Sequence, residues 1–212
     1  MADSPLPPLS AVLASGSNAD SPLARALSTL LEPSSILFNK LVSELATRLT
    51  ASPPVVSYTQ VLDRAFDVVK QWGDVHKLQF VRGHPRIGEV SGLSKLSAQE
   101  QGGDSANAKS TSTAQATPPE VLERLAFLNK CYERRYPGLV YITFVNGRSR
   151  AAIRDELEDK LRCDGALPDN EAGIAAIEPH DATGDVWVAE LNRAVGDVQR
   201  IARSRLSKLE SQ

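Results

Sequence analysis

The chain has 212 residues, is 42% hydrophobic and 24% charged, and carries a formal net charge of −2. This composition is typical of a soluble globular protein with a sizeable core, and we expect a single domain with inserted segments. There is no basic excess, and only 5% of the residues are aromatic, so a nucleic-acid partner is not expected.

The first quarter of the chain has helical spacing after a polar start. Residues 1–22 are rich in Pro, Ser, Ala and Gly, which predicts a flexible tail. Ser21 is placed to cap a helix that begins at Pro22. Leucines at helical spacing form two sets, one for each of two helices: Leu23, Leu27, Leu30 and Leu31, and then Leu37, Leu41, Leu45 and Leu49. Pro33 separates two helices within this stretch, with Ser34 or Ser35 as the second cap.

Two more helical segments lead to the centre of the chain. Ser57 is a cap for a helix with an apolar stripe from Val61 to Trp72, and residues 75–81 form a further short segment. Residues 91–101 are polar and favour a short helix. Residues 102–118 are low in complexity and lack large apolar groups, which predicts a flexible insert.

The second half again favours helices. Pro118-Pro119 opens one with an apolar face that ends at Tyr132, Ser149 caps another, and a long one begins near Asp185. The run 140–145 (VYITFV) fits either a strand or a buried helix start. Residues 164–184 are polar and predict a second flexible insert. Residues 23–212 are therefore expected to form an all-α, single-domain multi-helix bundle.

His84 is the most informative single residue. It stands between Gly83 and Pro85, and a proline disfavours the helical conformation for the residue before it. An imidazole titrates near neutral pH, so a His held at a stiff helix break is a candidate general acid or base. The alternative is that His84 only caps a helix or lies on a turn.

Other polar residues suggest a ligand but are weaker signals. The chain has no phosphate loop, no nucleophile elbow and no metal-ligand motif, and Cys131 and Cys163 fit reduced intracellular thiols. The pair Glu100-Gln101 can bind N–H and amide groups, and arginines of the last helix can bind a carboxylate or carbonyl. Equally, Glu100 fits a solvated helix position, and those arginines fit complementation of the helix dipole.

Several segments resemble one known family. Residues 83–88 (GHPRIG) and 97–101 (SAQEQ) look like the His-Pro loop and the S-x-x-E-Q motif of the OHCU decarboxylases. These enzymes are the 2-oxo-4-hydroxy-4-carboxy-5-ureidoimidazoline decarboxylases of uric acid breakdown. The other segments similar to family motifs, in order, are residues 31–34 (LEPS), 128–136 (LNKCYERRY), 144–149 (FVNGRS) and 201–206 (IARSRL).

The resemblance implies an all-helical, cofactor-free and commonly dimeric enzyme that forms (S)-allantoin and CO2 from a small ureidoimidazoline. It implies that His84 is the catalytic imidazole and that Pro85 shapes the pocket. Glu100 and Gln101 would bind the ureido and ring amides. Arg205 would bind the carbonyl or carboxylate side of the substrate, with Arg148 as a further candidate. No metal is implied.

The chain departs from the family pattern at two places. Glu89 follows the His loop where an uncharged residue or Asp is usual, and GGDSAN replaces the usual Ala-rich helix after Gln101. No apolar run could span a bilayer and no signal peptide is seen, so we expect no membrane partner and a peroxisomal or cytoplasmic protein. The peroxisomal tripeptide Ser207-Lys208-Leu209 is present but is not C-terminal. A non-catalytic ureide-binding module and a helical scaffold are the alternatives.

Overall fold

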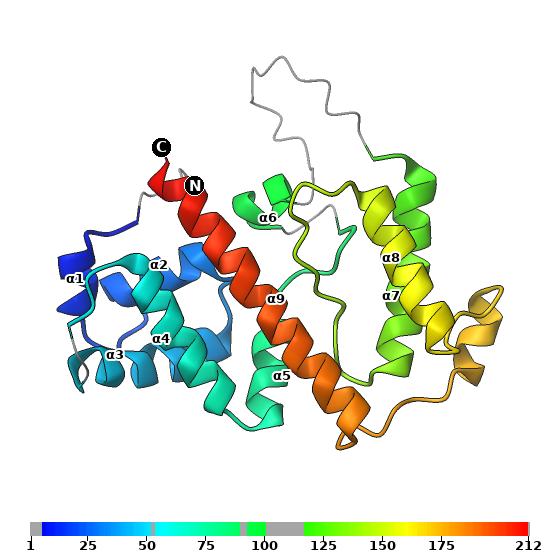
Figure 1. Cartoon of the computed structure of the whole chain (residues 1–212), viewed down its shortest axis with the longest axis horizontal. Coiled ribbons are helices and arrows are strands. Elements are labelled where there is room, and N and C mark those ends of the chain that lie inside the picture. Colours follow the sequence, from blue (N-terminus) through cyan, green and yellow to red (C-terminus); the bar gives the residue numbers. More distant parts are fainter. Residues whose placement is uncertain (1–5, 52–53, 90–92, 101–116, 212) are drawn as a thin grey trace, which may run out of the picture. The chain divides into compact units, whose positions relative to one another are not determined.

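The computed structural model describes residues 6–51, 54–89, 93–100 and 117–211, and its regular elements are all helices (Figure 1). The predicted all-α class is confirmed. Contacts within the chain define two compact units: residues 1–83 with 195–212, and residues 84–194. Except for its last two residues, the predicted insert at 102–118 lies outside the described residues.

The first unit contains the N-terminal helices and the second part of the last helix. Its elements are α1 (Leu9–Leu13), α2 (Pro22–Leu30), the π-helical turn η1 (Leu37–Leu41), α3 (Val42–Ala51), α4 (Tyr58–Gln71), α5 (Asp74–Arg82) and residues 195–210 of α9 (Asp185–Glu210). Two predicted caps are confirmed. Ser21 Oγ accepts from the amide of Ala24 at 3.1 Å, and Ser57 Oγ accepts from that of Gln60 at 3.2 Å.

Apolar side chains at helical spacing form the core of this unit, as the leucine pattern predicts. Leu23 and Leu27 have no exposed surface, and the ring of Phe80 lies edge-on to Phe66, with the centroids 6.2 Å apart. The composition of residues 1–22 predicts a loose tail, but residues 9–13 form α1, in which Val12 is 1% exposed. This part of the tail is therefore packed against the core.

The second unit is built around two long helices. Its elements are α6 (Lys95–Glu100), α7 (Pro119–Arg135), α8 (Arg150–Cys163), the 3-10 turn η2 (Glu171–Ala176) and residues 185–194 of α9. Helices α7 and α8 lie side by side (Figure 1). The ambiguous run 140–145 forms neither strand nor helix. It is an extended segment, and its Ile142 carbonyl accepts a hydrogen bond from Arg193 Nη1 at 2.9 Å.

A buried polar network holds α9 against α7 and α8 in this unit. Glu190 accepts from the Tyr132 hydroxyl at 2.7 Å and from Arg193 at 2.8 Å, and Lys160 lies 3.3 Å from its other oxygen. Burial by itself would raise the pKa of Glu190. The hydrogen bonds and positive charges of Arg193 and Lys160, together with the Tyr132 hydrogen bond, outweigh burial and lower that pKa.

We expect Glu190→Gln to weaken the acid dependence of stability. A carboxyl group whose pKa is lowered by folding contributes stability above its unfolded pKa, and this contribution is lost as the pH falls through the folded pKa. As the pH falls below 4.5, the ordinary pKa of Glu, the free energy of unfolding of the parent protein should therefore decrease more steeply than that of the variant. Urea denaturation between pH 3 and 7 measures this, and parallel curves would contradict it.

The segment 164–184 is more structured than its polar composition indicates. It contains η2, and Lys130 of α7 forms an ion pair with Glu171 at 2.7 Å. The amide of His180 donates to the carbonyl of Arg135 at 2.8 Å, and Arg135 Nη1 donates to the carbonyl of Glu178 at 2.7 Å. Contacts with α7, together with the buried side chains of Ala166 and Ile177, thus hold a segment that was expected to be flexible. None of the described helices contains an apolar stretch that would span a lipid bilayer.

Candidate active site

His84 is the first residue of the second unit and is only 7% exposed. It lies on a bend immediately after α5, as the Gly-His-Pro sequence predicts, and Pro85 beside it is half-buried. Gly83 is required for a steric reason rather than for an unusual backbone angle. A Cβ atom there would lie 2.9 Å from that of Ser34, which is in the same unit as Gly83.

The loop that follows His84 is closed by Glu89, the residue that departs from the family pattern. Its carboxylate accepts from the amide of Arg86 at 3.2 Å, and its own amide donates to the Arg86 carbonyl at 3.3 Å. Gly88 has a φ of +88°, which side chains other than glycine rarely adopt. Glu89 therefore stabilises a tight turn next to the candidate catalytic residue.

The same loop lies along one face of α7. Gly88 lies so close to α7 that a Cβ atom there would be 3.1 Å from Leu125, and one turn later Asn129 Nδ2 donates to the Ile87 carbonyl at 3.0 Å. Asn129 is 6% exposed, and its Oδ1 atom is buried and makes no hydrogen bond in the described part of the chain. That oxygen is an available acceptor for a ligand N–H group or a water molecule.

A third turn of α7 continues this contact. Arg86 forms a two-pronged ion pair with Glu133, in which Nη2 and Oε2 are 3.0 Å apart. The hydrogen bonding of the Arg86 guanidinium to the Glu133 carboxylate is the largest cause of a raised pKa of Arg86. Leu125, Asn129 and Glu133 are spaced by four residues and together form what we call the α7 docking face. The loop position after His84 is thus set by three consecutive turns of one helix.

Glu133→Gln should lower the turnover number by about tenfold, because small misplacements of a reacting group have large kinetic effects. Its effect on the free energy of unfolding should stay below about 1 kcal/mol, since the pair is partly exposed. Steady-state kinetics and urea denaturation measure the two quantities. The matched control is Glu171→Gln, which removes the exposed ion pair with Lys130 on the same helix. Equal turnover in both variants would contradict a positioning role.

Two of the predicted binding residues cannot be placed. Glu100 is the last residue of α6, and directly before this helix Ser94 Oγ accepts from the amide of Ser97 at 3.1 Å. The side chain of Glu100 and the whole of Gln101 lie outside the described residues. Their contact with the ureido and ring amides therefore stays a prediction.

Arg148 holds its own loop together. Its guanidinium donates to the carbonyls of Val145 at 3.1 Å and Phe144 at 2.5 Å and to the Thr143 hydroxyl at 3.0 Å, and it forms an ion pair with Glu156. These contacts shape the turn between the extended segment and α8. Contact of Arg148 with a substrate remains a prediction.

Arg205 lies in the first unit and is paired with Glu32. Its Nη2 atom is 2.8 Å from Glu32 Oε1, and the side chains are 2% and 7% exposed. A carboxylate at this distance fixes the orientation of the planar guanidinium. The sequence placed Glu32 in a family motif but did not assign it a role.

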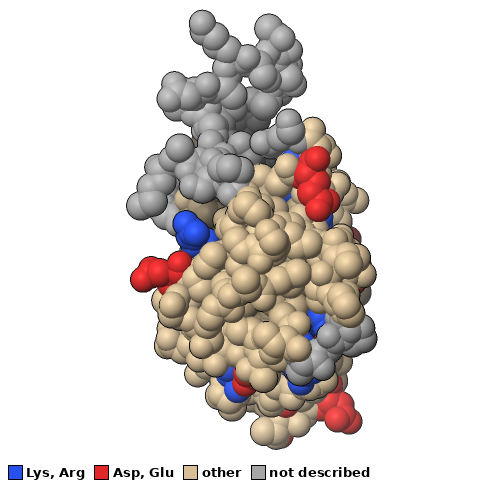
Figure 2. All heavy atoms as spheres, turned by 90° about the vertical axis from the view of Figure 1, so that its left-hand side faces the viewer, with Lys and Arg blue, Asp and Glu red and all other residues tan. Residues whose placement is uncertain are grey.

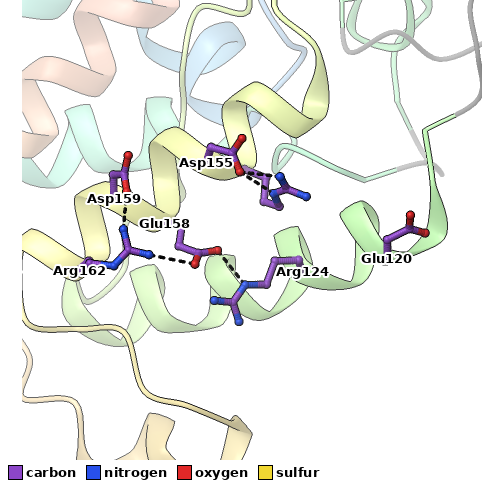
Figure 3. A pocket seen from close by; sticks show the side chains of 7 residues that line it. Glu120, Arg124, Asp155, Glu158, Asp159 and Arg162 are labelled. Atoms are coloured by element: carbon purple, nitrogen blue, oxygen red, sulfur yellow. Dashed lines mark hydrogen bonds and ion pairs between the residues drawn. The ribbon is translucent and has the colours of Figure 1, made fainter.

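A charged groove between α7 and α8 is a separate feature of the second unit (Figure 3). Its lining side chains are Glu120, Arg124, Arg154, Asp155, Glu158, Asp159 and Arg162. The arginines pair with carboxylates inside it; Glu158, for example, binds Arg124 at 2.9 Å and Arg162 at 3.1 Å. None of the predicted site residues lines this groove. Among the described residues, no cluster of His, Cys, Asp and Glu has the make-up of a metal site.

Comparison with known protein families decides the identity. The OHCU decarboxylase family model matches residues 20–185, which include the His84 loop, α6, α7 and α8. The chain belongs to the OHCU decarboxylase family. It is therefore a carboxy-lyase, and the sequence-based expectation of this family is confirmed.

A solved structure of an OHCU decarboxylase, crystallised in the presence of (S)-allantoin, is similar at 20% sequence identity and a TM-score of 0.49. The similarity covers 80% of this chain and 92% of the other. A search of curated proteins returned no match. Family membership rests on the match to the OHCU decarboxylase family model.

Proposed function

We propose that the chain converts 2-oxo-4-hydroxy-4-carboxy-5-ureidoimidazoline to (S)-allantoin and CO2 without a cofactor, with His84 as the general acid and base. The match to the family model is the observation that carries this proposal. It is supported by the bend that buries His84 and by the docking of the following loop on α7.

The chemistry suits one imidazole. Loss of CO2 leaves an electron pair on a carbon next to a C=N bond, and that bond can take up the pair. The protein has to hold the carboxylate so that its C–C bond is perpendicular to the ring π system. His84 would accept the hydroxyl proton as the decarboxylated carbon becomes a carbonyl, and it would deliver a proton to one face of the neighbouring carbon of the former C=N bond, which sets the S configuration. Removal of water from the pocket favours departure of CO2 from the carboxylate.

The other predicted residues would bind and orient the substrate. Pro85 would shape the wall beside the imidazole, and Glu100 and Gln101 would bind the ureido and ring N–H groups. Arg205, oriented by Glu32, would bind the carboxylate or carbonyl side of the substrate, and Arg148 is a further candidate.

The decisive experiment supplies freshly made 5-hydroxyisourate together with its hydrolase and follows allantoin by circular dichroism. Rapid appearance of the (S) signal and of CO2 is the expected result. Racemic allantoin at the uncatalysed rate, with tight allantoin binding, would identify a non-catalytic ureide-binding module. Absence of both turnover and allantoin binding would favour a scaffold.

We also propose a homodimer. Figure 2 shows a face of the N-terminal helices on which charged side chains lie mainly toward the margins. Such a surface can be covered without burying unpaired charges. Light scattering on the purified protein should give twice the chain mass of 22.9 kDa. A monomer at micromolar concentration would contradict the proposal.

A further inference from the structure

The Arg150 guanidinium is buried and has few hydrogen-bond partners. Only 7% of the residue is exposed, and Nη1 donates to the Thr117 hydroxyl at 3.1 Å. Its Nε atom is buried and has no hydrogen-bond partner in the described part of the chain. A buried guanidinium has several donors to satisfy, so one neutral hydroxyl leaves most of its capacity unused.

Most other arginines of the second unit are paired with a carboxylate, and Arg134 and Arg135 donate to backbone carbonyls instead. The ones that form an ion pair with a carboxylate are Arg86, Arg124, Arg148, Arg154, Arg162 and Arg193. Arg150 has no such carboxylate among the described residues. Burial lowers the pKa of its guanidinium. A buried charge without a counter-ion is costly, and this cost is usually offset by a bound partner.

The position of Arg150 in the fold adds to this cost. It is the first residue of α8, directly after the cap Ser149, whose Oγ accepts from the amide of Ala152 at 3.1 Å. The peptide dipoles make the start of a helix positive, which disfavours a cation there. The Ser149 cap already binds the amides of Ala152 and Ile153, so an anion would be held mainly by the guanidinium and would also offset the positive end of the helix dipole.

We propose that the Arg150 guanidinium, at the start of α8, forms a binding site for a small oxyanion. Two sources share this chemistry, namely the carboxylate of a ligand with a hydantoin-like ring and a separate inorganic anion such as phosphate. The first source rests on the proposed function, because it would place the scissile carboxylate at Arg150. The second source does not depend on decarboxylation.

The test measures binding of three probes to the full chain by calorimetry. Hydantoin-5-acetate carries a ring and a carboxylate, (S)-allantoin has the ring without a carboxylate, and inorganic phosphate is the anion alone. The variants are Arg150→Gln and, as the matched control, Arg154→Gln. Arg154 lies one turn further along α8, and its side chain is 28% exposed and paired with Asp155.

Arg150→Gln should weaken binding of at least one anionic probe by about tenfold or more. It should leave (S)-allantoin binding unchanged, and Arg154→Gln should behave like the parent protein. A loss confined to hydantoin-5-acetate identifies the ligand carboxylate, and a loss confined to phosphate identifies a separate anion. If Arg150→Gln does not fold, the Arg150 Nε–H resonance of the parent protein should still shift on titration with an anionic probe.

The proposal is overturned if Arg150→Gln binds both anionic probes as tightly as the parent protein does. It is also overturned if neither anionic probe shifts the Arg150 Nε–H resonance. The binding assays need no turnover, so they stay informative when decarboxylation fails. Anion binding through Arg150 without CO2 release would disprove the proposed function and leave the anion site standing. CO2 release without anion binding through Arg150 would support the proposed function and disprove the anion site.

Discussion

His84→Asn should lower the turnover number of decarboxylation by about 10²–10⁴-fold, the usual contribution of a positioned acid or base. Asparagine can form hydrogen bonds but cannot exchange a proton near neutral pH, so the loop is retained while proton transfer is lost. CO2 release and the sign of the allantoin dichroism measure the effect.

The matched control for this substitution is His76→Asn, because His76 is exposed on α5 and no catalytic or binding role is predicted for it. That variant should keep full activity. The melting temperature of His84→Asn should stay close to that of the parent protein, since a polar side chain still occupies the bend. Undiminished turnover in His84→Asn would remove the imidazole from the mechanism.

Glu32→Gln should destabilise the protein by about 3–5 kcal/mol, the usual cost of removing one partner from a buried ion pair. The remaining Arg205 guanidinium is only 2% exposed, so water cannot replace the lost carboxylate. Urea denaturation measures the change. The double variant Glu32→Gln with Arg205→Met should recover part of the loss, because it removes both charges.

An exposed pair on the same helix provides the comparison. Arg203 binds Asp63 at 2.6 Å with side chains that are 52% and 44% exposed. Asp63→Asn should therefore cost less than about 1 kcal/mol. Equal losses in Glu32→Gln and Asp63→Asn would mean that burial of the Glu32 pair has no energetic consequence.

The local features of this fold could be predicted from the sequence. Ser21, Ser57 and Ser149 cap the helices that they precede, because an N-cap depends only on the next three residues. The bend at His84 is likewise a local effect of Pro85. The run 140–145 was ambiguous because its conformation depends on a distant donor, Arg193.

The contacts between residues far apart in the sequence could not be predicted in the same way. Glu32 and Arg205 are 173 residues apart, and a single sequence gives no sign of their pairing. Asn129 was the one available clue to the α7 docking face, because a polar residue interrupts an otherwise apolar stripe between Leu125 and Tyr132. Arg150 was missed because an arginine at a helix start is ordinarily solvated.

The pairing of Arg86 with Glu133 has a consequence for descent within the OHCU decarboxylases. The two side chains form an ion pair, so a change at position 133 that removes the acid would relax selection on the guanidinium at position 86. Substitutions at these two positions should accordingly coincide along lineages, and position 89, whose carboxylate also lies 3.4 Å from the Arg86 guanidinium, should depend on the same arginine.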